Sequence, residues 1–389
     1  MDLYKPLTTA FRGFLMCFFF WALAGFRVHL AHLRLRDFRN YARLDIDFGP
    51  GFHLLAGNNA QGKTNLLEAL YLLATLRSFR GVGSAQMVRH GQKGYFVGAT
   101  VIGQGQNEIK MYWSARERSL TLNHQRIRKA TDYLGILRTV VFCTEDLQLI
   151  KGPGRGRRRF MDLLLAQTRP GYLALLLRYA QALRSRNAIL KRPTLDPIAL
   201  ESFTRELITT GQEIIKLRRE LIPLLSPMVQ SAYSRIASGV EELLIDYHPS
   251  VKNDFAVELA QSQPREQAYR LTLIGPHRDE LKLSLNDRPL AQFGSEGQKR
   301  SLAIALKLAQ AEYLTLTHGL LPVLLIDDVM GELDSQRRKG FLPLLNRVHE
   351  TSGQVFMTST EENWVQEIGR KVHRWEVKAG TVQRCYPSA

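Results

Sequence analysis

The chain has 389 residues, of which 45% are hydrophobic and 23% are charged, with 53 lysines and arginines against 36 aspartates and glutamates. This length and composition exclude a disordered or low-complexity chain and allow one large or two ordinary folded domains. The net charge of +17 suits a polyanionic partner such as a nucleic acid or a membrane surface, although a solvated basic face explains it equally well.

The first 27 residues differ from the rest of the chain in their pattern of apolar residues. An apolar run, Gly13–Phe26, follows Arg12 and has the layout of a secretory signal peptide. It is too short to span a bilayer as a helix. Because ordinary globular patterning begins only at Val28, we interpret residues 1–27 as a mis-assigned N-terminal extension. We therefore expect no stable membrane association.

Three cysteines are spread along the chain without a CxxC spacing or a nearby histidine pair. The sequence thus predicts neither a disulfide framework nor a zinc site. This cysteine usage fits a reducing cytoplasm. The three residues are Cys17, Cys143 and Cys385.

Two strands joined by a turn are predicted for His29–Leu35 and Leu44–Phe48, where apolar and polar residues alternate. A third strand, Phe52–Ala56, leads directly into Gly57–Thr64, which matches the phosphate-binding loop pattern G-x-x-x-x-G-K-[ST]. Backbone N–H groups in such a loop point inward and hold a triphosphate at the start of the next helix. The predicted nucleotide-binding residues are Gly57, Asn58, Asn59, Ala60, Gln61, Gly62, Lys63 and Thr64.

Two side chains of this loop have distinct chemical roles. Lys63 is expected to meet the β and γ phosphates and so to act in catalysis, and Thr64 to place its hydroxyl on Mg²⁺. Apolar residues after Thr64 recur at helical spacing, which predicts a helix that seats the loop against a sheet. The loop therefore predicts a nucleoside triphosphate and Mg²⁺ as cofactors.

Residues 28–156 are predicted to form an α/β lobe, because more strand-like runs follow the first helix. These runs lie at 95–102, 108–113, 119–122 and 139–142.

Beyond Lys151 the hydrophobic spacing becomes that of long helices as far as about Gly239. We expect an antiparallel helical arm within residues 157–265, with helices of roughly 25 residues that extend about 40 Å. A helical subdomain packed on the lobe fits the same pattern. The α/β pattern returns in residues 266–389, so the insertion splits the nucleotide-binding fold.

A second part of the site is predicted at Val323–Ile326, an apolar strand that ends in Asp327 and Asp328. This is the arrangement of a Walker B segment. Asp327 is expected to hold Mg²⁺ opposite Thr64. Asp328 is expected to act in catalysis by orienting or deprotonating the attacking water, a step that needs a carboxylate just past the metal ligand.

The segment Gly294–Arg300 begins the helix before that strand and resembles the S-x-G-Q signature of ABC-type ATPases. Hydroxyl and N–H groups at a helix start favour a γ phosphate, which in this superclass belongs to the other subunit. Gly331–Asp334, just past the Walker B strand, resembles the D-loop of the same class. The alternative is a serine cap on an ordinary helix. The residues expected at the nucleotide from this side are Ser295, which we count as catalytic, Gly297, Gln298 and Asp334.

Six segments in the same order resemble the RecF family of bacterial recombination mediators, over residues from about Val28 to Thr360. The chain departs from the family pattern in its N-terminal extension and at Cys143-Thr144, where a proline is common. The segments are 35–41, the phosphate loop with its helix, 145–147, 151–162, 275–280 and 327–334.

The resemblance implies an α/β fold in which an ABC-type ATPase head, a P-loop NTPase, is split by an inserted helical arm. It implies slow ATP hydrolysis that is stimulated by DNA and used as a switch. An ATP-dependent homodimer is expected to clamp duplex DNA near single-strand gaps. With RecO and RecR as partners, the family helps to load RecA for gap repair, replication restart and the SOS response, in the cytoplasm.

Two other functions are compatible with parts of the sequence. A transporter ATPase is the weaker one, because Thr358-Ser359-Thr360 stands where transporters carry a histidine. A structural DNA-binding protein that uses ATP only to assemble is the stronger one, because Asp328 stands in place of a glutamate.

A basic run after the first lobe is predicted to lie on DNA phosphates, which gives binding that is salt-sensitive and independent of base sequence. A solvated basic face is the alternative. His277 and Arg278 are assigned either to the nucleotide or dimer face or to an ordinary turn. The predicted DNA-binding residues are Lys151, Arg155, Arg157, Arg158 and Arg159.

Overall fold

The computed structural model describes residues 28–103, 105–237, 241–359 and 372–385. The predicted N-terminal extension, residues 1–27, lies outside this part of the chain, as does Cys17. Within the described part, no helix is long and apolar enough to cross a membrane. Two free cysteines are described, Cys143, which is buried, and Cys385, which is exposed.

The N-terminal strands form one antiparallel sheet. They are β1 (His29–Phe38), β2 (Tyr41–Asp47), β4 (Gly94–Ile102), β5 (Gln106–Ser114), β6 (Arg118–Leu122) and β7 (Gln125–Arg126). Their order is β2-β1-β4-β5-β6-β7. Along β1, Leu33 and Leu35 are buried whereas Arg34 and Arg36 are exposed, because side chains alternate between the two faces of a strand. The alternation that predicts these strands is therefore confirmed, while the short β7 is an addition to the predicted strands.

A second sheet carries the phosphate loop. Its strands are β3 (Gly51–Ala56), β8 (Thr139–Phe142), β12 (Val323–Ile326), β13 (Gln354–Ser359), β14 (Val372–Lys378) and β15 (Thr381–Cys385). The order is β15-β14-β3-β13-β12-β8, and all neighbours except β14 and β15 run parallel. Since β8 precedes the helical insertion and β12 follows it, their pairing joins the two halves of the split fold, as predicted.

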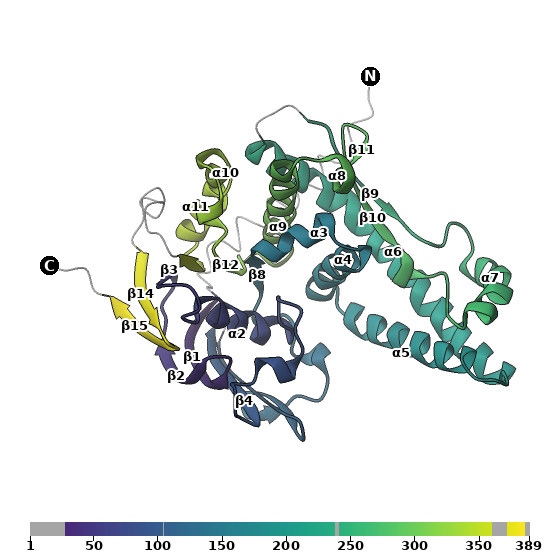
Figure 1. The fold of residues 1–389 in the computed structure, drawn as a ribbon, viewed down its shortest axis with the longest axis horizontal. Helices are drawn as coiled ribbons and strands as arrows, with labels where there is room; N and C mark the ends of the chain where they lie inside the picture. Colours follow the sequence, from purple (N-terminus) through teal and green to yellow (C-terminus); the bar gives the residue numbers. More distant parts are fainter. Residues whose placement is uncertain (1–27, 104, 238–240, 360–371, 386–389) are drawn as a thin grey trace.

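Both faces of this second sheet are buried, each in its own hydrophobic core. Leu55 and Phe356 pack on the side of helix α2 (Lys63–Thr75) and the first sheet. Leu54 and Met357 pack on the opposite side, with helix α9 (Glu296–His318). Figure 1 shows α2 and α9 on different sides of β8 and β12. Strands buried on both faces read as continuous apolar runs, which is why Val323–Ile326 is recognisable in the sequence.

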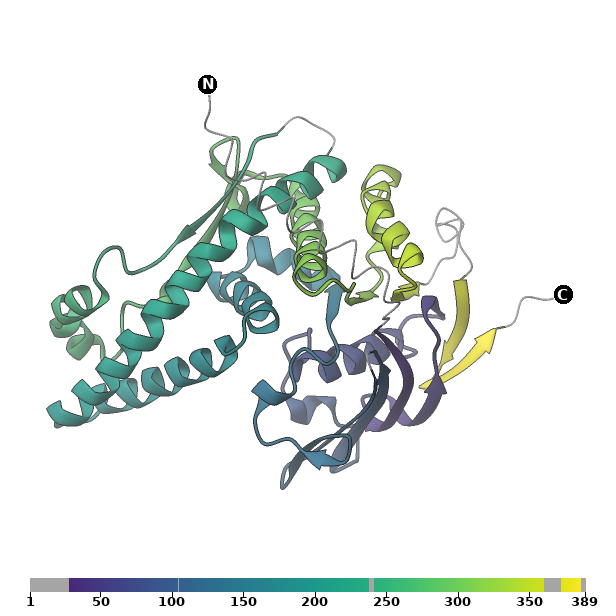
Figure 2. The same cartoon turned by 180° about the vertical axis from the view of Figure 1, so that it is seen from behind.

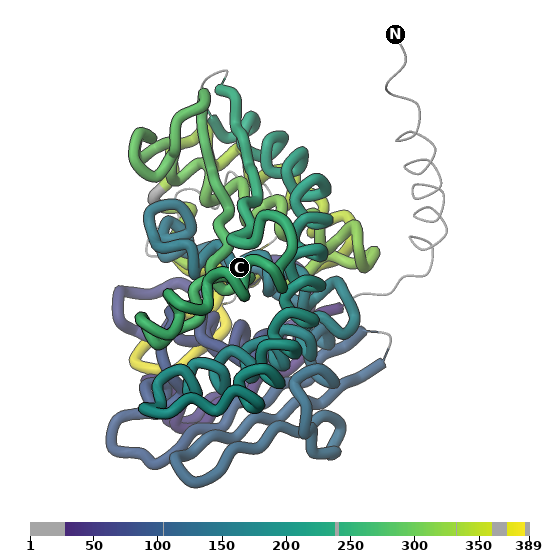
Figure 3. Tube along the Cα trace, turned by 90° about the vertical axis from the view of Figure 1, so that its right-hand side faces the viewer, coloured from purple at the N-terminus to yellow at the C-terminus, as the bar shows by residue number. Residues whose placement is uncertain are grey.

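Three long helices make up most of the insertion. They are α4 (Gly154–Thr168), α5 (Tyr172–Leu190) and α6 (Pro197–Ile236). Helices α5 and α6 lie side by side and project from the head as an arm (Figure 1), which points toward the viewer in Figure 3. The arm is less symmetric than the sequence predicts. Helix α6 has 40 residues, about 60 Å at 1.5 Å per residue, instead of roughly 25.

Helix α6 is long because its apolar pattern continues through Pro223 and Pro227. Leu225, between these prolines, and Val229, beyond them, are buried in the same core as α9, against which α6 packs. The sequence allows two interpretations of the insertion, a helical arm and a helical subdomain packed on the lobe. Each describes one half of α6, because the first half of this helix belongs to an arm and the second half packs on the head.

A third, small sheet lies beside α6. Its strands are β9 (Leu243–His248), β10 (Glu280–Leu285) and β11 (Arg288–Pro289). Strand β10 lies in residues 266–389, where the α/β pattern is predicted to return, whereas β9 falls among the residues assigned to the arm. The remaining helices are α3 (Gln148–Lys151), α7 (Phe255–Tyr269), α8 (Leu290–Phe293), α10 (Ser335–Lys339) and α11 (Leu342–Glu350).

One buried arginine anchors α6 to the head. Arg218 is 2% exposed and donates to Asp279 Oδ2 at 2.8 Å, to the Pro276 carbonyl at 2.7 Å and to Asp162 Oδ1 at 2.8 Å. Asp279 and Pro276 belong to the segment GPHRDE, and Asp162 lies on α4. The arginine bridges the two carboxylates, so this segment holds α4 and α6 together.

Replacing Arg218 by alanine is expected to lower the free energy of unfolding by about 3–5 kcal/mol, because the buried Asp279 loses its ion-pair partner. The matched control is Arg219→Ala, which removes an exposed arginine one position along the same helix and should change stability by less than about 0.5 kcal/mol. Urea unfolding of the two variants and the parent measures the difference. Equal stability of both variants would contradict the anchoring role.

Candidate nucleotide site

The phosphate loop is shaped by two glycines with positive φ. Gly57 has φ of 151° and Gly62 has φ of 119°, in the region that favours glycine. A Cβ at Gly57 would lie 2.4 Å from the Val377 carbonyl oxygen, and a Cβ at Gly62 would lie 2.6 Å from Asn40 Nδ2. Only glycine lets the loop pass this close to β14 and to the β1–β2 turn.

The β1–β2 turn holds the loop from outside. Asn40 Nδ2 donates to the Gln61 carbonyl at 2.8 Å, and the Tyr41 hydroxyl donates to the Gly62 carbonyl at 3.0 Å. Asn65, in the first turn of α2, donates to Asn40 Oδ1 at 2.8 Å. Sequence reasoning assigned no role to Asn40 and Tyr41. A signal was present, because both lie in the segment 35–41 that carries the family resemblance.

Lys63 lies inside the loop and is 4% exposed. Its Nζ donates to the carbonyl oxygens of Gly57 at 2.6 Å and Asn58 at 3.2 Å. The ammonium group thus spans the loop from within, where it can exchange carbonyl oxygens for phosphate oxygens without moving far. This is the placement that its predicted role requires.

The predicted metal-binding pair is in direct contact. The Thr64 hydroxyl donates to Asp327 Oδ1 at 2.8 Å, and the Thr358 hydroxyl donates to the same oxygen at 2.9 Å. Thr358 Oγ1 also accepts from the Asp328 backbone N–H at 2.8 Å. In the sequence Thr358 stands out only as a replacement for a histidine, and the structure shows that it holds both aspartates in place.

Burial raises the pKa of Asp327 to about 6, against the opposing effect of the hydrogen bonds from Thr64 and Thr358, and the charges of Asp328 and Glu145 raise it further. A carboxylate in this position gains from a cation beside it. Two protein ligands with phosphate oxygens and water are a usual set for Mg²⁺, so Thr64 and Asp327 fit the ion. The described residues contain no cluster of three or more side chains that would form an all-protein metal site.

A cavity of about 490 Å³ surrounds the loop. It is lined by the whole of 58–65 and by Asp328, together with Arg39, Asn40 and Arg80 from the surrounding elements. Arg39 makes two hydrogen bonds of 2.7 Å to Glu68, which orient its guanidinium. The cavity therefore brings together the loop and the Walker B carboxylate, but none of the four residues predicted from the signature and D-loop lines it.

Those four residues gather elsewhere, at the start of α9. Ser295 caps the helix: its hydroxyl accepts from the Gln298 N–H at 3.2 Å, and Gln298 Oε1 accepts from the Ser295 N–H at 2.7 Å. A Cβ at Gly297 would lie 2.6 Å from Arg337 Nη2, and Arg337 is paired with Asp334, which caps α10. The cap interpretation and the signature interpretation are thus compatible in geometry.

The five residues of the predicted DNA-binding run do not share one surface in the structure. Arg157 makes hydrogen bonds of 2.6 and 2.9 Å to Glu280, and Arg158 donates to the Asp279 carbonyl at 2.6 Å, so both serve internal contacts. Lys151 pairs with Glu296 at 2.6 Å. Adjacency in sequence suggests one basic surface, but successive helical residues face different directions. The exposed members of the run that no ion pair engages among the described residues are Arg155 and Arg159.

His277 and Arg278 do not line the nucleotide cavity. His277 Nδ1 is 2.6 Å from the Tyr179 hydroxyl on α5, and Nε2 is 3.2 Å from the Thr272 carbonyl. Burial lowers the pKa of His277 to about 4, so the ring is neutral near pH 7. Of the two interpretations offered, the turn is the one that these contacts support.

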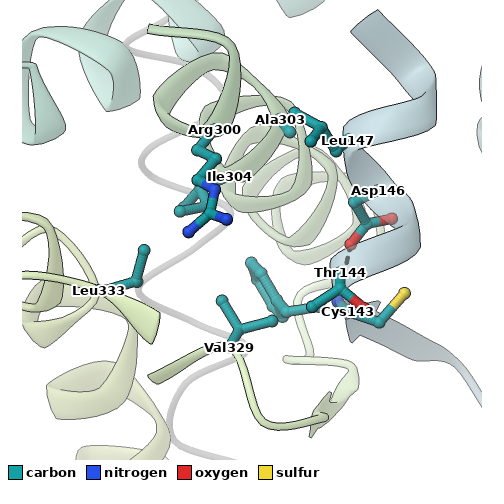
Figure 4. A pocket seen from close by; sticks show the side chains of 10 residues that line it. Cys143, Thr144, Asp146, Leu147, Arg300, Ala303, Ile304, Val329 and Leu333 are labelled. Carbon is teal, nitrogen blue, oxygen red and sulfur yellow. Dashed lines mark hydrogen bonds between the residues drawn. The ribbon is translucent and has the colours of Figure 1, made fainter. Parts of the chain in front are cut away.

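A second cavity, of about 380 Å³, lies between α9 and the loop after Asp328 (Figure 4). Arg300 reaches toward it from α9, and Val329 and Leu333 line the opposite side. Burial raises the pKa of the Cys143 thiol at its wall, so this cysteine is not a nucleophile near neutral pH. This cavity separates the Walker B loop from α9, the helix that Ser295 caps.

The split parallel sheet, the phosphate loop and the paired aspartates define an ATPase head of the ABC and SMC class. Residues 29–383 match the family model described as RecF/RecN/SMC N terminal domain. The chain is 37% identical to the DNA replication and repair protein RecF of Symbiobacterium thermophilum, over 91% of this chain and 98% of that protein. It is 34% identical to RecF of Lactococcus lactis subsp. cremoris, over 91% and 99%. The chain belongs to the RecF family.

Solved structures agree with this assignment. The recombination mediator protein RecF with ATP, in the RecFOR pathway, superposes with a TM-score of 0.84 at 29% identity, over 92% of this chain and 98% of that one. A RecF–ATPrS structure gives 0.82 at 29% identity, over 92% and 99%. The Smc head domain of Pyrococcus furiosus, at 0.54 and 17% identity over 92% and 96%, shares the fold alone.

The raised pKa of Asp327 predicts how stability depends on pH in the absence of nucleotide and Mg²⁺. Above pH 6 the buried carboxylate is ionised at a cost, and this cost disappears below about pH 4, where both folded and unfolded chains are protonated. Asp327→Asn keeps an oxygen that accepts from Thr64 and Thr358 and should stabilise the chain at pH 8 by up to about 3 kcal/mol.

Urea unfolding of the parent and the Asp327→Asn variant from pH 4 to pH 8 measures this difference, which should shrink as the pH falls through 6. Thr358→Val is the informative companion, because it removes one hydroxyl donor from the ionised form and should reduce stability most at high pH. A variant Asp327→Asn that is less stable than its parent at pH 8 would contradict the interpretation.

Proposed function

We propose that this protein is an ATP-dependent DNA clamp of recombinational repair, in which ATP joins two copies of the chain and hydrolysis releases them. The observation that carries the proposal is the incomplete nucleotide site. Lys63, Thr64 and Asp328 share one cavity, whereas Ser295 stands at the start of α9 and does not line it. A second copy can supply that face, because a helix start with a serine hydroxyl favours a γ phosphate.

Each residue of the site has a defined task in this proposal. Lys63 turns from the loop carbonyls to the β and γ phosphates, and Thr64 and Asp327 hold Mg²⁺, which offsets the charge of the phosphates when bound. Asp328 orients the water that attacks the γ phosphorus and accepts its proton, while the bond from the γ phosphorus to the β–γ bridging oxygen breaks and ADP leaves. Ser295 of the second copy binds the γ phosphate and so makes dimerisation depend on ATP.

The family supports the choice of DNA as the partner. Relatives that cover nearly the whole chain are DNA replication and repair proteins, and the net charge of +17 suits a polyanion. We propose that the dimer clamps duplex DNA at single-strand gaps in the cytoplasm and acts with RecO and RecR to help load RecA. Gap repair, replication restart and SOS induction are the processes that this activity would serve.

The first test separates ATP binding from ATP hydrolysis. Lys63→Arg should weaken ATP binding and abolish ATP-dependent dimers and DNA binding, because a longer, planar cation does not fit inside the loop. Asp328→Asn should slow hydrolysis about a hundredfold or more and trap the ATP-bound dimer on DNA. Mass measurement, DNA affinity and phosphate release with ATP, ADP and no nucleotide give the three readouts.

Two results would change the conclusion. Equal DNA binding in all three nucleotide states would remove ATP as a switch. An Asp328→Asn variant that dissociates from DNA as fast as its parent would favour the alternative function, a DNA-binding protein that ATP assembles without turnover.

The second test asks whether two chains build one site. Ser295→Ala and Lys63→Arg should each prevent ATP-dependent dimers of one variant alone. A mixture of the two variants should recover one intact site per heterodimer, because the Ser295→Ala chain still offers its loop and the Lys63→Arg chain still offers its serine. Mass measurement of the mixture with ATP shows the heterodimer, and hydrolysis should return to a part of the parent rate. No recovery in the mixture would argue for a site within one chain.

A further inference from the structure

The signature segment contains one carboxylate that is unfavourable for a phosphate site. Glu296 is the first residue of α9 and directly follows Ser295, the helix cap that is proposed to bind a γ phosphate. The side chain of Glu296 is 62% exposed, so it lies at the surface that a second copy would approach. An ionised carboxylate repels a phosphate. Without a partner, Glu296 would therefore oppose the binding that Ser295 is proposed to provide.

A lysine from a different element meets this carboxylate. Lys151 is the last residue of α3, and its Nζ lies 2.6 Å from Glu296 Oε2. Lys299, three residues further along α9, lies at the longer distance of 3.8 Å from Glu296 Oε1. The hydrogen bond from Lys151 is the largest of the effects that lower the pKa of Glu296. Lys151 is thus the main partner of the carboxylate.

The segment that carries Lys151 is held on α9 by a second, buried ion pair. Residues 144–151 follow β8, and α3 packs against α9. Asp146 Oδ1 lies 3.8 Å from Lys307 Nζ, and both side chains are largely buried. This inner pair can hold the segment against the middle of α9, so the exposed contact of Lys151 with Glu296 is not needed to dock α3.

The opposite side of the helix start shows the same pairing of acid and cation. Asp334, which the D-loop segment brings to this region, pairs with Arg337 of α10. A Cβ at Gly297 would lie 2.6 Å from Arg337 Nη2, so this guanidinium lies beside the first turn of α9. Figures 1 and 2 show α9 between α3 and α10. Acids on two sides of the helix start are therefore each paired with a cation.

An ordinary surface ion pair is the alternative explanation for Lys151. A glutamate in the first turn of a helix is favoured by the helix dipole, and exposed ion pairs add little to stability. The dipole, however, stabilises Glu296 whether or not Lys151 is present. A phosphate that arrives at Ser295 meets a different situation, because it is repelled by the carboxylate unless a cation neutralises it.

We propose that Lys151 is a positioning residue for dimerisation, which neutralises Glu296 and holds it at the end of α3 so that Ser295 can bind the γ phosphate of a second copy. The inference rests on the proposed function, in which Ser295 meets the ATP of the other chain. Lys151 acts through Glu296 and does not itself touch the nucleotide. The basic run after the first lobe therefore contains a residue that serves the interface between two chains and not DNA.

The test measures the dissociation constant of the dimer by ultracentrifugation of the full chain with Mg²⁺ and ATPγS, without DNA. Lys151→Met should weaken the dimer about tenfold or more, because each site then carries an uncompensated carboxylate. Lys151→Arg should behave like the parent, because a guanidinium can make the same ion pair. Glu296→Gln should leave the dimer at least as tight as the parent. The double variant with Lys151→Met and Glu296→Gln should return to within about threefold of the parent.

Two further measurements separate dimerisation from folding and from nucleotide binding. The melting temperature of each variant should stay close to that of the parent, because the pair is exposed. The affinity of the monomer for ATPγS should also be unchanged, since neither Lys151 nor Glu296 lines the cavity around the phosphate loop. The matched control is Lys216→Met, which removes a lysine that pairs with Glu213 at 3.6 Å on α6 and should leave the dimer unchanged.

The outcomes distinguish this inference from the proposed function. A Lys151→Met dimer as tight as that of the parent overturns the inference, while ATP-dependent dimerisation still stands. A defect that Glu296→Gln does not rescue also overturns it, because Lys151 would then act on the phosphate directly. The same holds for a defect that accompanies a large fall in melting temperature, which would make the role structural. Parent chains that stay monomeric with ATPγS overturn the proposed function and this inference together.

Discussion

The nucleotide site depends on one buried carboxylate. Asp327 stands at the carboxyl end of β12, and its Oδ1 accepts from Thr64, which follows β3, and from Thr358 of β13. Parallel strands end at the same edge of a sheet, where open α/β folds bind their ligands, so residues some 260 and 30 positions away converge on one oxygen. Burial raises the pKa of Asp327, so the ionised carboxylate gains from a cation beside it. The phosphate loop, Thr64 and Asp328 are all arranged around this point.

The signature end of the head is held from two directions. Gln298 donates to Glu241 at 2.6 Å, and Glu241 accepts from Tyr233 of α6 at 2.5 Å. On the other side, Arg337 of α10 lies over Gly297 and pairs with Asp334. Helix α6 also extends into the arm. The start of α9, the D-loop helix and the arm are therefore packed into one unit, and the cavity of Figure 4 separates part of that unit from the Walker B loop.

The excess of positive charge is used in two ways. Arg157 and Arg218 are held by internal carboxylates and join the insertion to the head. Arg36 and Arg43 have no carboxylate partner among the described residues and face solvent on the side of the antiparallel sheet away from α2. Net charge alone does not distinguish these uses, because a buried ion pair and an exposed cation count equally in a sum. The distinction lies in which carboxylates the fold brings within hydrogen-bond distance.

The sequence by itself determined the loop Gly57–Thr64, the strand before Asp327 and the split of the fold, because these depend on local spacing and on continuous apolar runs. Only the tertiary structure decided which distant groups meet. Thr358 at Asp327, Asn40 at the loop, and Glu280 at Arg157 lie tens to hundreds of residues from their partners. Strand register decides that Arg43, Arg36, Phe96 and Tyr112 are cross-strand neighbours. The hydrophobic pattern predicts which face of the sheet each side chain lies on, but not which residues of other strands lie next to it. Local motifs can be predicted from the sequence, whereas the packing of the chain decides which of them meet in space.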